Sequence, residues 1–180
     1  MHTRMHNRYA SFLLAAALLA LPAQVLAEAD DDLQVLGWIE TVEIGERGFG
    51  LDAKLDTGAD NSSLHAIDIE LFERNDIDWV RFTVELDDGE HGEFEYPQER
   101  TAHIRRAAGG TEDRPVIKLG ICIGTIHREV EVNLTDRSDL SYPMLIGRSF
   151  LREHILVDSG PKYTHDPECD VDNGNWVDDE

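Results

Sequence analysis

The feature that most limits the possible folds is a repeated alternation of apolar and polar residues with a period of two. Residues 80–86 carry Val, Phe, Val and Leu at every second position, with Arg, Thr and Glu between them. The same alternation recurs over residues 117–123 and 130–134. Because successive side chains of a β-strand point to opposite faces, this pattern predicts strands with one buried face.

Turn-forming residues separate these strands. Clusters of Gly, Asp and Thr stand at residues 87–89, 109–111 and 124–125. Helical signal is confined to a turn or two after Leu64 and a short helix over residues 148–154. Several short strands with regular turns favour a small β-barrel or β-sandwich.

The N-terminal segment has the pattern of a secretory signal peptide. Arg4 and Arg8 precede an apolar run over residues 10–21, and small residues follow up to Ala27. The alternative is a membrane anchor, but a spanning helix needs about 20 apolar residues, and this run is shorter and ends at a proline. We therefore expect residues 1–27 to be removed by cleavage near Ala27, which predicts a periplasmic or secreted protein with no stable membrane anchor.

Removing that segment leaves 153 residues, enough for one domain. The segment holds two of the 16 basic residues and none of the 37 acidic ones, so the mature net charge is −23. Such a charge excludes nucleic acid and anionic membrane surfaces as partners, because both need a basic footprint, and would repel acidic substrates at a distance. We expect an acidic leader at 28–34, a domain at 35–160 and a loosely ordered acidic tail at 161–180.

Two cysteines remain, Cys122 and Cys169. An exported protein can keep a disulfide, and a bridge between these two would attach the tail to the outside of the barrel. Two unpaired thiols are the alternative, and the spacing does not decide between them. The chain has no Cys-x-x-Cys motif.

The strongest candidate for chemistry is Asp56-Thr57-Gly58-Ala59. The preceding apolar residues predict a strand that delivers Asp56 into a tight turn, where Gly58 can take backbone angles closed to other residues. The small side chains leave room for a second copy of the loop to approach. An ordinary surface turn is the alternative, since Asp, Thr and Gly all favour turns.

Together with later motifs, this loop resembles the retropepsins, the retroviral-type aspartic proteases. They combine an Asp-Thr-Gly-Ala-Asp loop with an apolar-apolar-Gly-Arg segment that leads into a helix. The chain is similar, still more closely, to a bacterial family often labelled ATP-dependent zinc proteases, from about Gly37 to Asp158. The segments that carry this likeness are Gly37-Trp38-Ile39-Glu40, the Asp56 loop with Ser62-Ser63-Leu64-His65-Ala66, Trp79-Val80-Arg81-Phe82, Arg114-Pro115-Val116-Ile117, Leu134-Thr135-Asp136-Arg137 and Leu145-Ile146-Gly147-Arg148.

The resemblance implies an all-β fold, a small closed β-barrel of the retropepsin (acid protease) type with one short C-terminal helix. It also implies an aspartic endopeptidase that acts on a peptide or protein substrate as a homodimer, with one Asp56 from each copy. Two carboxylates held close share one proton, so one can activate a water while the other protonates the substrate. Thr57 would brace the two loops, and Gly58 would offer its backbone to the substrate.

The resemblance further assigns supporting roles. Ala59 would line the site, and Asp60 and Arg148 match positions that form an ion pair in retroviral enzymes. Two solvated surface charges are the alternative for that pair.

A hairpin flap covers the substrate in retropepsins. The matching segment is residues 101–118, with a tip near Gly109 and Gly110, because adjacent glycines suit a mobile turn. An ordinary hairpin is the alternative.

The zinc and ATP of the family label have no motif here. The chain lacks His-Glu-x-x-His and a phosphate-binding loop, so we expect no metal and no cofactor. A second segment of the form Asp-Ser/Thr-Gly begins at Asp158, as in a two-lobed chain, but too few residues follow it to build another core. Two further functions stay open: a catalytically silent peptide-binding module, and an amidase that acts on unusual peptides.

Overall fold

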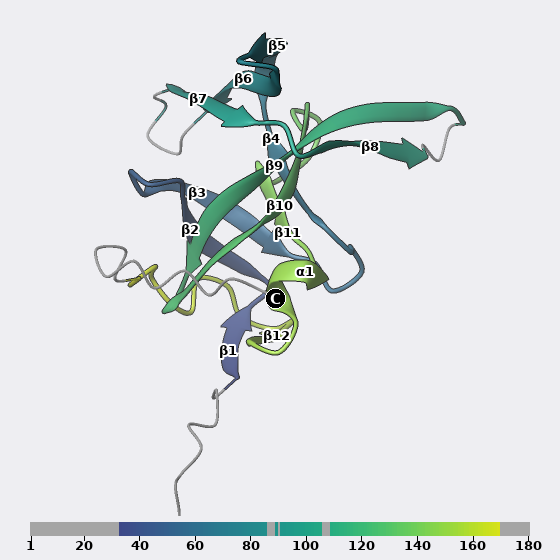
Figure 1. Ribbon diagram of the computed structural model, residues 1–180. Coiled ribbons are helices and arrows are strands. Elements are labelled where there is room, and N and C mark those ends of the chain that lie inside the picture. The colour runs from purple at the N-terminus through teal and green to yellow at the C-terminus, as the bar shows by residue number, and fades with distance from the viewer. Residues whose placement is uncertain (1–32, 86–88, 90, 106–108, 170–180) are drawn as a thin grey trace, which may run out of the picture. The chain divides into compact units, whose positions relative to one another are not determined.

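The computed structural model gives a nearly all-β protein (Figure 1). The chain divides into two compact units, residues 1–30 and 31–180, and every described residue belongs to the second. The expected signal peptide, most of the acidic leader, part of the hairpin tip and the end of the tail lie outside the described residues. Within the described part, no helix is long and apolar enough to cross a membrane. The structure describes residues 33–85, 89, 91–105 and 109–169.

In chain order the described elements are β1 (Gln34–Gly37), β2 (Ile39–Ile44), β3 (Phe49–Leu55), β4 (Ser62–His65), β5 (Ile67–Arg74), β6 (Ile77–Glu85), β7 (His91–Pro97), β8 (Arg100–Arg105), β9 (Thr111–Ile123), β10 (Ile126–Thr135), β11 (Met144–Ile146), α1 (Arg148–Leu151) and β12 (Ile155–Asp158).

Six of these strands form a closed barrel. β10, β4, β11, β3, β2 and β9 pair in that order, and the pairing of β9 with β10 closes the ring. β8 extends the sheet outside the ring by pairing with β9. The structure therefore confirms the expected all-β fold, a closed barrel with one short helix.

The predicted alternation fills the barrel with apolar side chains. Along β9, Ile117, Leu119, Ile121 and Ile123 are fully buried. Burying side chains of this size stabilises the fold by about 1.5 to 3 kcal/mol each. This interior holds the strands that carry the candidate site in fixed register.

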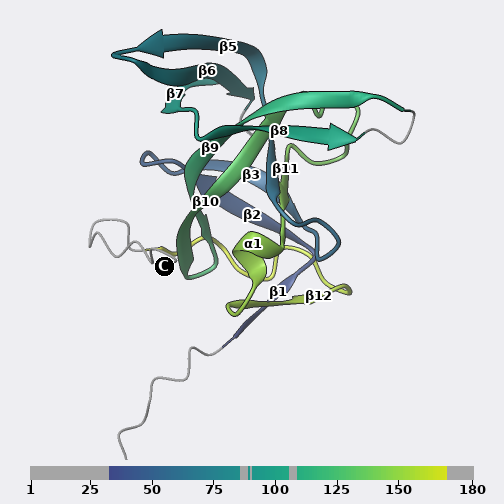
Figure 2. The same cartoon turned by 45° about the vertical axis from the view of Figure 1, so that its right-hand side comes forward.

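A separate three-stranded sheet, β5-β6-β7, lies beside the barrel (Figure 2). Phe94 of this sheet packs edge-to-face on Phe49 of β3, with ring centroids 5.2 Å apart. The helical turn expected after Leu64 was wrong, because β4 pairs in parallel with β10 and the chain then continues as β5. Asn75 and Asp76, both at positive φ, form the turn into β6.

The expected helix over residues 148–154 is shorter than predicted. α1 ends at Leu151, and Arg152 already has an extended backbone, with φ −55° and ψ 133°. Glu153 then takes a φ of 69°, and the chain turns into β12. Pairing of β12 with β1 in parallel ends the helix early, because the chain must reverse to reach that strand.

The segment after β12 lies against the barrel. We expected a loosely ordered tail from residue 161, but in residues 161–169 the Tyr163 N–H donates to the Ile39 carbonyl at 2.8 Å. The Glu168 N–H donates to the Gly124 carbonyl at 2.7 Å, and Cys169 forms a disulfide with Cys122.

A buried carboxylate holds this segment in place. Glu40 is fully buried. Its two oxygens accept hydrogen bonds from the Gly37 N–H, the Thr164 N–H and hydroxyl, and the His165 N–H. Removal of any buried partner would leave an unsatisfied charge, so the arrangement ties the C-terminal segment to β2.

The first strand meets the same turn as the last described residue. The Gln34 amide oxygen accepts from the Thr125 N–H at 3.4 Å, while the Cys169 sulfur lies 3.6 Å from the Gly124 carbonyl oxygen. The β9–β10 turn is therefore the meeting point of both ends of the domain.

Candidate active site

β3 ends by placing Asp56 in a tight loop. The Asp56 N–H donates to the Ile146 carbonyl of β11 at 2.8 Å, and the Ala59 N–H donates back to the Asp56 carbonyl at 3.2 Å. The Gly58 N–H donates to the Asp56 carboxylate at 2.9 Å. A Cβ on Gly58 would lie 3.1 Å from that oxygen, so glycine keeps the approach to the carboxylate open.

Lys54 is the charged neighbour of this carboxylate. Its Nζ lies 3.1 Å from an Asp56 oxygen, and the Asp56 side chain is 26% exposed. Burial raises the pKa of Asp56, but the Gly58 N–H and the Lys54 ammonium together outweigh it and hold that pKa below the ordinary value. In the single protomer Asp56 is thus ionised at neutral pH.

The backbone around Gly147 supports the loop from behind. The Arg148 N–H donates to the Ala59 carbonyl at 3.0 Å, and the Ser149 N–H donates to the Asp60 carbonyl at 2.9 Å. The Gly147 N–H donates to the Ser62 hydroxyl at 3.1 Å. The segment that begins α1 is therefore bonded directly to the loop that follows Asp56.

The Arg148 side chain adds a second layer of support. Its guanidinium donates to the Thr57 carbonyl at 3.2 Å and to the Asp60 carboxylate at 3.0 Å. Both side chains of the ion pair are exposed, 47% for Arg148 and 71% for Asp60. The pair exists in the structure, although its exposure makes it weak by itself.

One protomer supplies one such loop. Asp158, in the Asp-Ser-Gly segment, ends β12 opposite Gly37, and its carboxylate accepts from the Gly160 N–H at 2.9 Å. No strand follows β12 in the described residues, so they contain no second lobe. The roles predicted for Thr57 and Gly58 at a dimer axis stay predictions.

A hollow of about 420 Å³ is lined by Lys54, whose ammonium pairs with Asp56, and we refer to it as the hollow beside Asp56. It combines two basic side chains, Lys54 and Arg137, with aromatic and aliphatic walls. Burial and the neighbouring Arg114 lower the pKa of Arg137, while the Asp56 carboxylate opposes them, so Arg137 and Asp56 interact electrostatically. The lining residues are Trp38, Lys54, Arg137, Leu140, Ser141, Tyr142 and Leu145.

Sequence reasoning did not select these basic residues. For Lys54 the signal was available, because residues two apart on a strand share a face, and this places Lys54 beside Asp56. Arg137 is separated from Asp56 by 81 positions and reaches it through the loop after β10. Only the closed barrel brings the two together.

The β8–β9 hairpin stands next to the Asp56 loop, residues 56–61. β8 and β9 form this hairpin (Figure 2), and their register runs from Arg100 opposite Val116 to Arg105 opposite Thr111. Gly109 and Gly110 take φ of 94° and 89° at its end. A hollow of about 210 Å³ is lined by Asp60 and Asn61 from the loop and by hairpin residues. The hairpin is present as expected, and its function as a flap stays a prediction.

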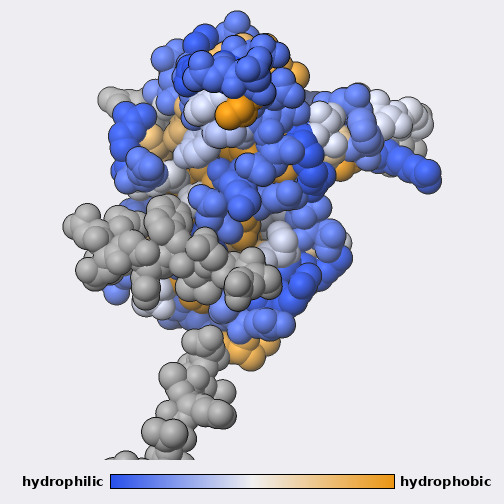
Figure 3. All heavy atoms as spheres, in the orientation of Figure 1, coloured by the Kyte–Doolittle hydropathy of each residue, from blue (hydrophilic) through white to orange (hydrophobic). Residues whose placement is uncertain are grey.

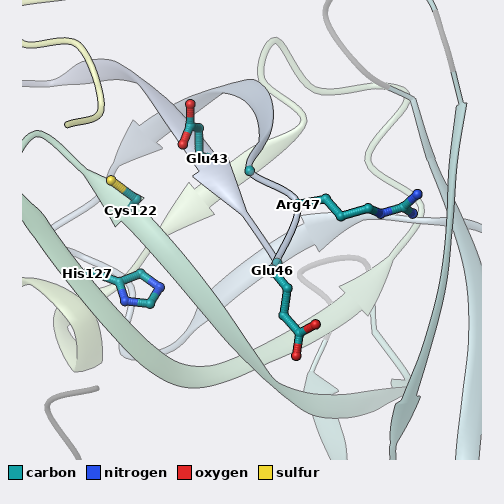
Figure 4. A pocket seen from close by; sticks show the side chains of 7 residues that line it. Glu43, Glu46, Arg47, Cys122 and His127 are labelled. Atoms are coloured by element: carbon teal, nitrogen blue, oxygen red, sulfur yellow. The ribbon is translucent and has the colours of Figure 1, made fainter. Parts of the chain in front are cut away.

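Another hollow, of about 190 Å³, is lined by residues outside the Asp56 loop (Figure 4). Glu43, Glu46, Arg47, Cys122 and His127 line it. Burial lowers the pKa of His127, which favours its neutral form. Among the described residues, no group of three His, Cys, Asp or Glu side chains is arranged to hold a metal ion.

Comparison with known proteins gives matches over most of the domain. The RimB-like family model, described as the retropepsin-like aspartic endopeptidase RimB, matches residues 35–168. A "Probable alpha-L-glutamate ligase" of Parasynechococcus marenigrum (strain WH8102) is 34% identical over 124 residues, which cover 66% of this chain and 26% of that protein. A protein of the same name from Desulfotalea psychrophila is 27% identical over 129 residues, 69% of this chain and 28% of that one.

The chain thus spans about a quarter of the length of these curated relatives. A crystal structure from Legionella pneumophila superposes with a TM-score of 0.62 and 34% identity, covering 72% of this chain and 96% of that chain. That protein is described as having unknown function.

Proposed function

The chain belongs to the RimB-like family of retropepsin-like aspartic endopeptidases, and from this premise we propose that it hydrolyses peptide bonds as a homodimer. The observation that carries the proposal is the Asp56 carboxylate, which the Gly58 N–H orients on a loop bonded to α1. A carboxylate fixed in this way is already positioned before substrate arrives.

A second copy would complete the chemistry. When two Asp56 carboxylates approach each other, repulsion raises the pKa of one of them, so the pair holds a single proton. The ionised member accepts a proton from water as that water attacks the amide carbonyl, and the protonated member donates to the developing oxyanion. The low pKa of Asp56 in one protomer supplies the ionised member.

The two-stranded β1–β12 sheet is the surface we propose for dimer contact. Leu33, Val35 and Leu156 are exposed there by 45%, 54% and 52%. Hydrophobic atoms are visible at this end of an otherwise mostly hydrophilic face (Figure 3). Three exposed apolar side chains, two on these short strands and Leu33 just before β1, favour burial against a second copy.

A Leu156→Asp variant tests this surface. We expect it to shift the protein from dimer to monomer in sedimentation equilibrium and to lose peptide cleavage, because the site needs both copies. A monomeric wild-type protein with full activity would refute the dimer.

We further propose that glutamate-bearing peptides are the substrate class. Lys54 and Arg137 place two cations in the hollow beside Asp56, in a protein with a net charge of −21. Its overall charge repels acidic chains at a distance, whereas these cations would favour a carboxylate that reaches the hollow. Relatives named alpha-L-glutamate ligase support the same class.

Export through residues 1–27 also remains our proposal. It is supported by the disulfide between Cys122 and Cys169, because disulfides persist in oxidising compartments. Detection of the protein in the cytoplasmic fraction with its N-terminal segment intact would contradict it.

The decisive experiment compares the wild type with Asp56→Asn on a peptide library from pH 3 to pH 8. We expect the variant to stay folded and dimeric and to lose cleavage, because an amide cannot act as the base. Equal cleavage by both proteins would exclude the aspartic mechanism. Peptide binding without turnover by the wild type would favour the silent binding module instead, and cleavage confined to non-standard amide bonds would favour the amidase.

A further inference from the structure

The C-terminal segment, residues 161–169, carries a lysine to the rim of the hollow beside Asp56. Lys162 Nζ lies 4.4 Å from the ring centroid of Trp38 and 3.2 Å from the Tyr142 hydroxyl. Trp38 and Tyr142 both line that hollow and pack edge-to-face, with centroids 6.2 Å apart. The position of the ammonium is therefore set by two residues of the hollow.

The segment does not depend on Lys162 for its attachment. Three hydrogen bonds to Glu40, two from Thr164 and one from His165, and the Cys122–Cys169 disulfide hold it to the barrel. Tyr163 also donates from its hydroxyl to the Asp52 carboxylate at 2.6 Å. A contact between an exposed ammonium and aromatic rings contributes little beside these attachments.

Within the described residues no carboxylate forms an ion pair with Lys162. Its ammonium donates to a neutral phenol and faces aromatic rings, which leaves its charge uncompensated. Other described cations do form ion pairs: Arg81 pairs with Glu95, and Arg100 pairs with Glu131. An unneutralised cation held at a pocket rim is available to a ligand carboxylate.

We infer that Lys162 is a specificity-determining residue that selects a carboxylate side chain of the substrate, together with Arg137. This inference rests on the proposed function and adds a residue that lies outside the barrel and reaches the site through the C-terminal segment. It predicts that the segment forms one wall of the substrate site.

The test compares Lys162→Met and Lys162→Arg with the wild type. Each protein is given a short peptide of alternating glutamate and alanine, and a matched peptide with glutamine for glutamate. We expect Lys162→Met to lower kcat/KM for the glutamate peptide by about fivefold, in line with loss of one exposed ion pair. The glutamine peptide should change by less than about twofold, and Lys162→Arg should keep most of the preference.

Lys118→Met is the matched control. Lys118 lies on β9 with its side chain 58% exposed, and it is absent from the hollow beside Asp56. Lys118→Met removes the same charge from the protein as Lys162→Met does. An equal loss of kcat/KM on the glutamate peptide in both Met variants would mean a general charge effect and would overturn the inference. Cys169→Ser should reproduce part of the loss, because it frees the end of the segment.

A binding measurement distinguishes failure of this inference from failure of the proposed function. Asp56→Asn, which keeps the hollow, is titrated with the glutamate peptide by calorimetry, with and without Lys162→Met. If the wild type cleaves neither peptide, the proposed endopeptidase fails, but a fivefold weaker binding caused by Lys162→Met still supports the assignment. Unchanged binding and unchanged kcat/KM on the glutamate peptide would refute it.

Discussion

Gly147→Ala is the sharpest test of how the Asp56 loop, residues 56–61, is supported from behind. Gly147 has φ −93° and ψ 177°, angles that alanine adopts readily, so the substitution introduces no backbone strain of its own. Its effect comes from contact alone. An added Cβ would lie 2.6 Å from both the carbonyl carbon and the carbonyl oxygen of Asn61, and 2.9 Å from the Asp60 carbonyl oxygen.

The magnitude follows from these distances. Ordinary van der Waals contact begins at 3.4 Å, so the backbone at Asn61 must move by about 0.8 Å. Main-chain atoms cannot rotate away as a flexible side chain can. Overpacking of this kind costs about 1 to 3 kcal/mol. A displacement of about 1 Å near reacting groups lowers rates on the order of a hundredfold, because the geometry for attack is lost.

Gly50→Ala provides the matched control. Gly50 lies on β3, where an added Cβ meets no atom within 4 Å. We expect it to leave the melting temperature unchanged or to raise it slightly, since alanine restricts the unfolded chain. Gly147→Ala should lower the melting temperature by about 2 to 4 °C for each kcal/mol lost. Equal melting temperatures and equal cleavage rates for the two variants would refute the tight packing behind the loop.

Lys54→Met should raise the pKa of Asp56, measured by carboxyl NMR titration. A lowered carboxyl pKa stabilises the folded state at pH values above the ordinary pKa, and this stabilisation is lost as the pH falls through the folded-state pKa. The variant should therefore lose it at a higher pH than the wild type does. An Asp56 titration that does not move would contradict this. Arg148→Met should lower the free energy of unfolding by about 0.2 to 1 kcal/mol in urea, because its ion pair is exposed; a loss several times larger would show that the pair carries more of the fold. Cys169→Ser opens a disulfide that spans 47 residues and should cost about 2 to 4 kcal/mol in the same assay, whereas reductant that leaves the wild type unchanged would argue against the bridge.

The strand pattern of the barrel could be predicted from sequence because it is local. Ile117, Leu119 and Ile121 alternate along β9, and every one of them points into the core. The Asp56 loop was equally visible, since a strand followed by Thr-Gly marks a turn. Both inferences need only neighbouring residues and the geometry of a strand.

The errors arose where distant segments decide the local conformation. A helical turn was expected after Leu64, but the chain there forms β5: Ile69 and Leu71 are exposed, and pairing with β6 decides the structure of the segment. α1 was predicted too long because nothing local announces that β12 must reach β1. Tertiary pairing overrides propensity in both cases.

The composition of the candidate site was predicted only in part. Arg137 and Lys162 reach the hollow through long connections, and neither has a local signal. The acidic composition of the tail indicated looseness, but Thr164 and the buried Glu40 hold its first part against β2. A few specific hydrogen bonds therefore outweigh what composition suggests.

Gln34 and Cys169 both contact the β9–β10 turn, and this affects how such a domain can be joined to other sequence. Because the two ends of the described domain meet at this turn, neighbouring sequence can be joined at both ends without separating the strands of the barrel. That geometry suits a module that can be appended to, or spliced between, other folding units, and its relatives are about four times its matched length.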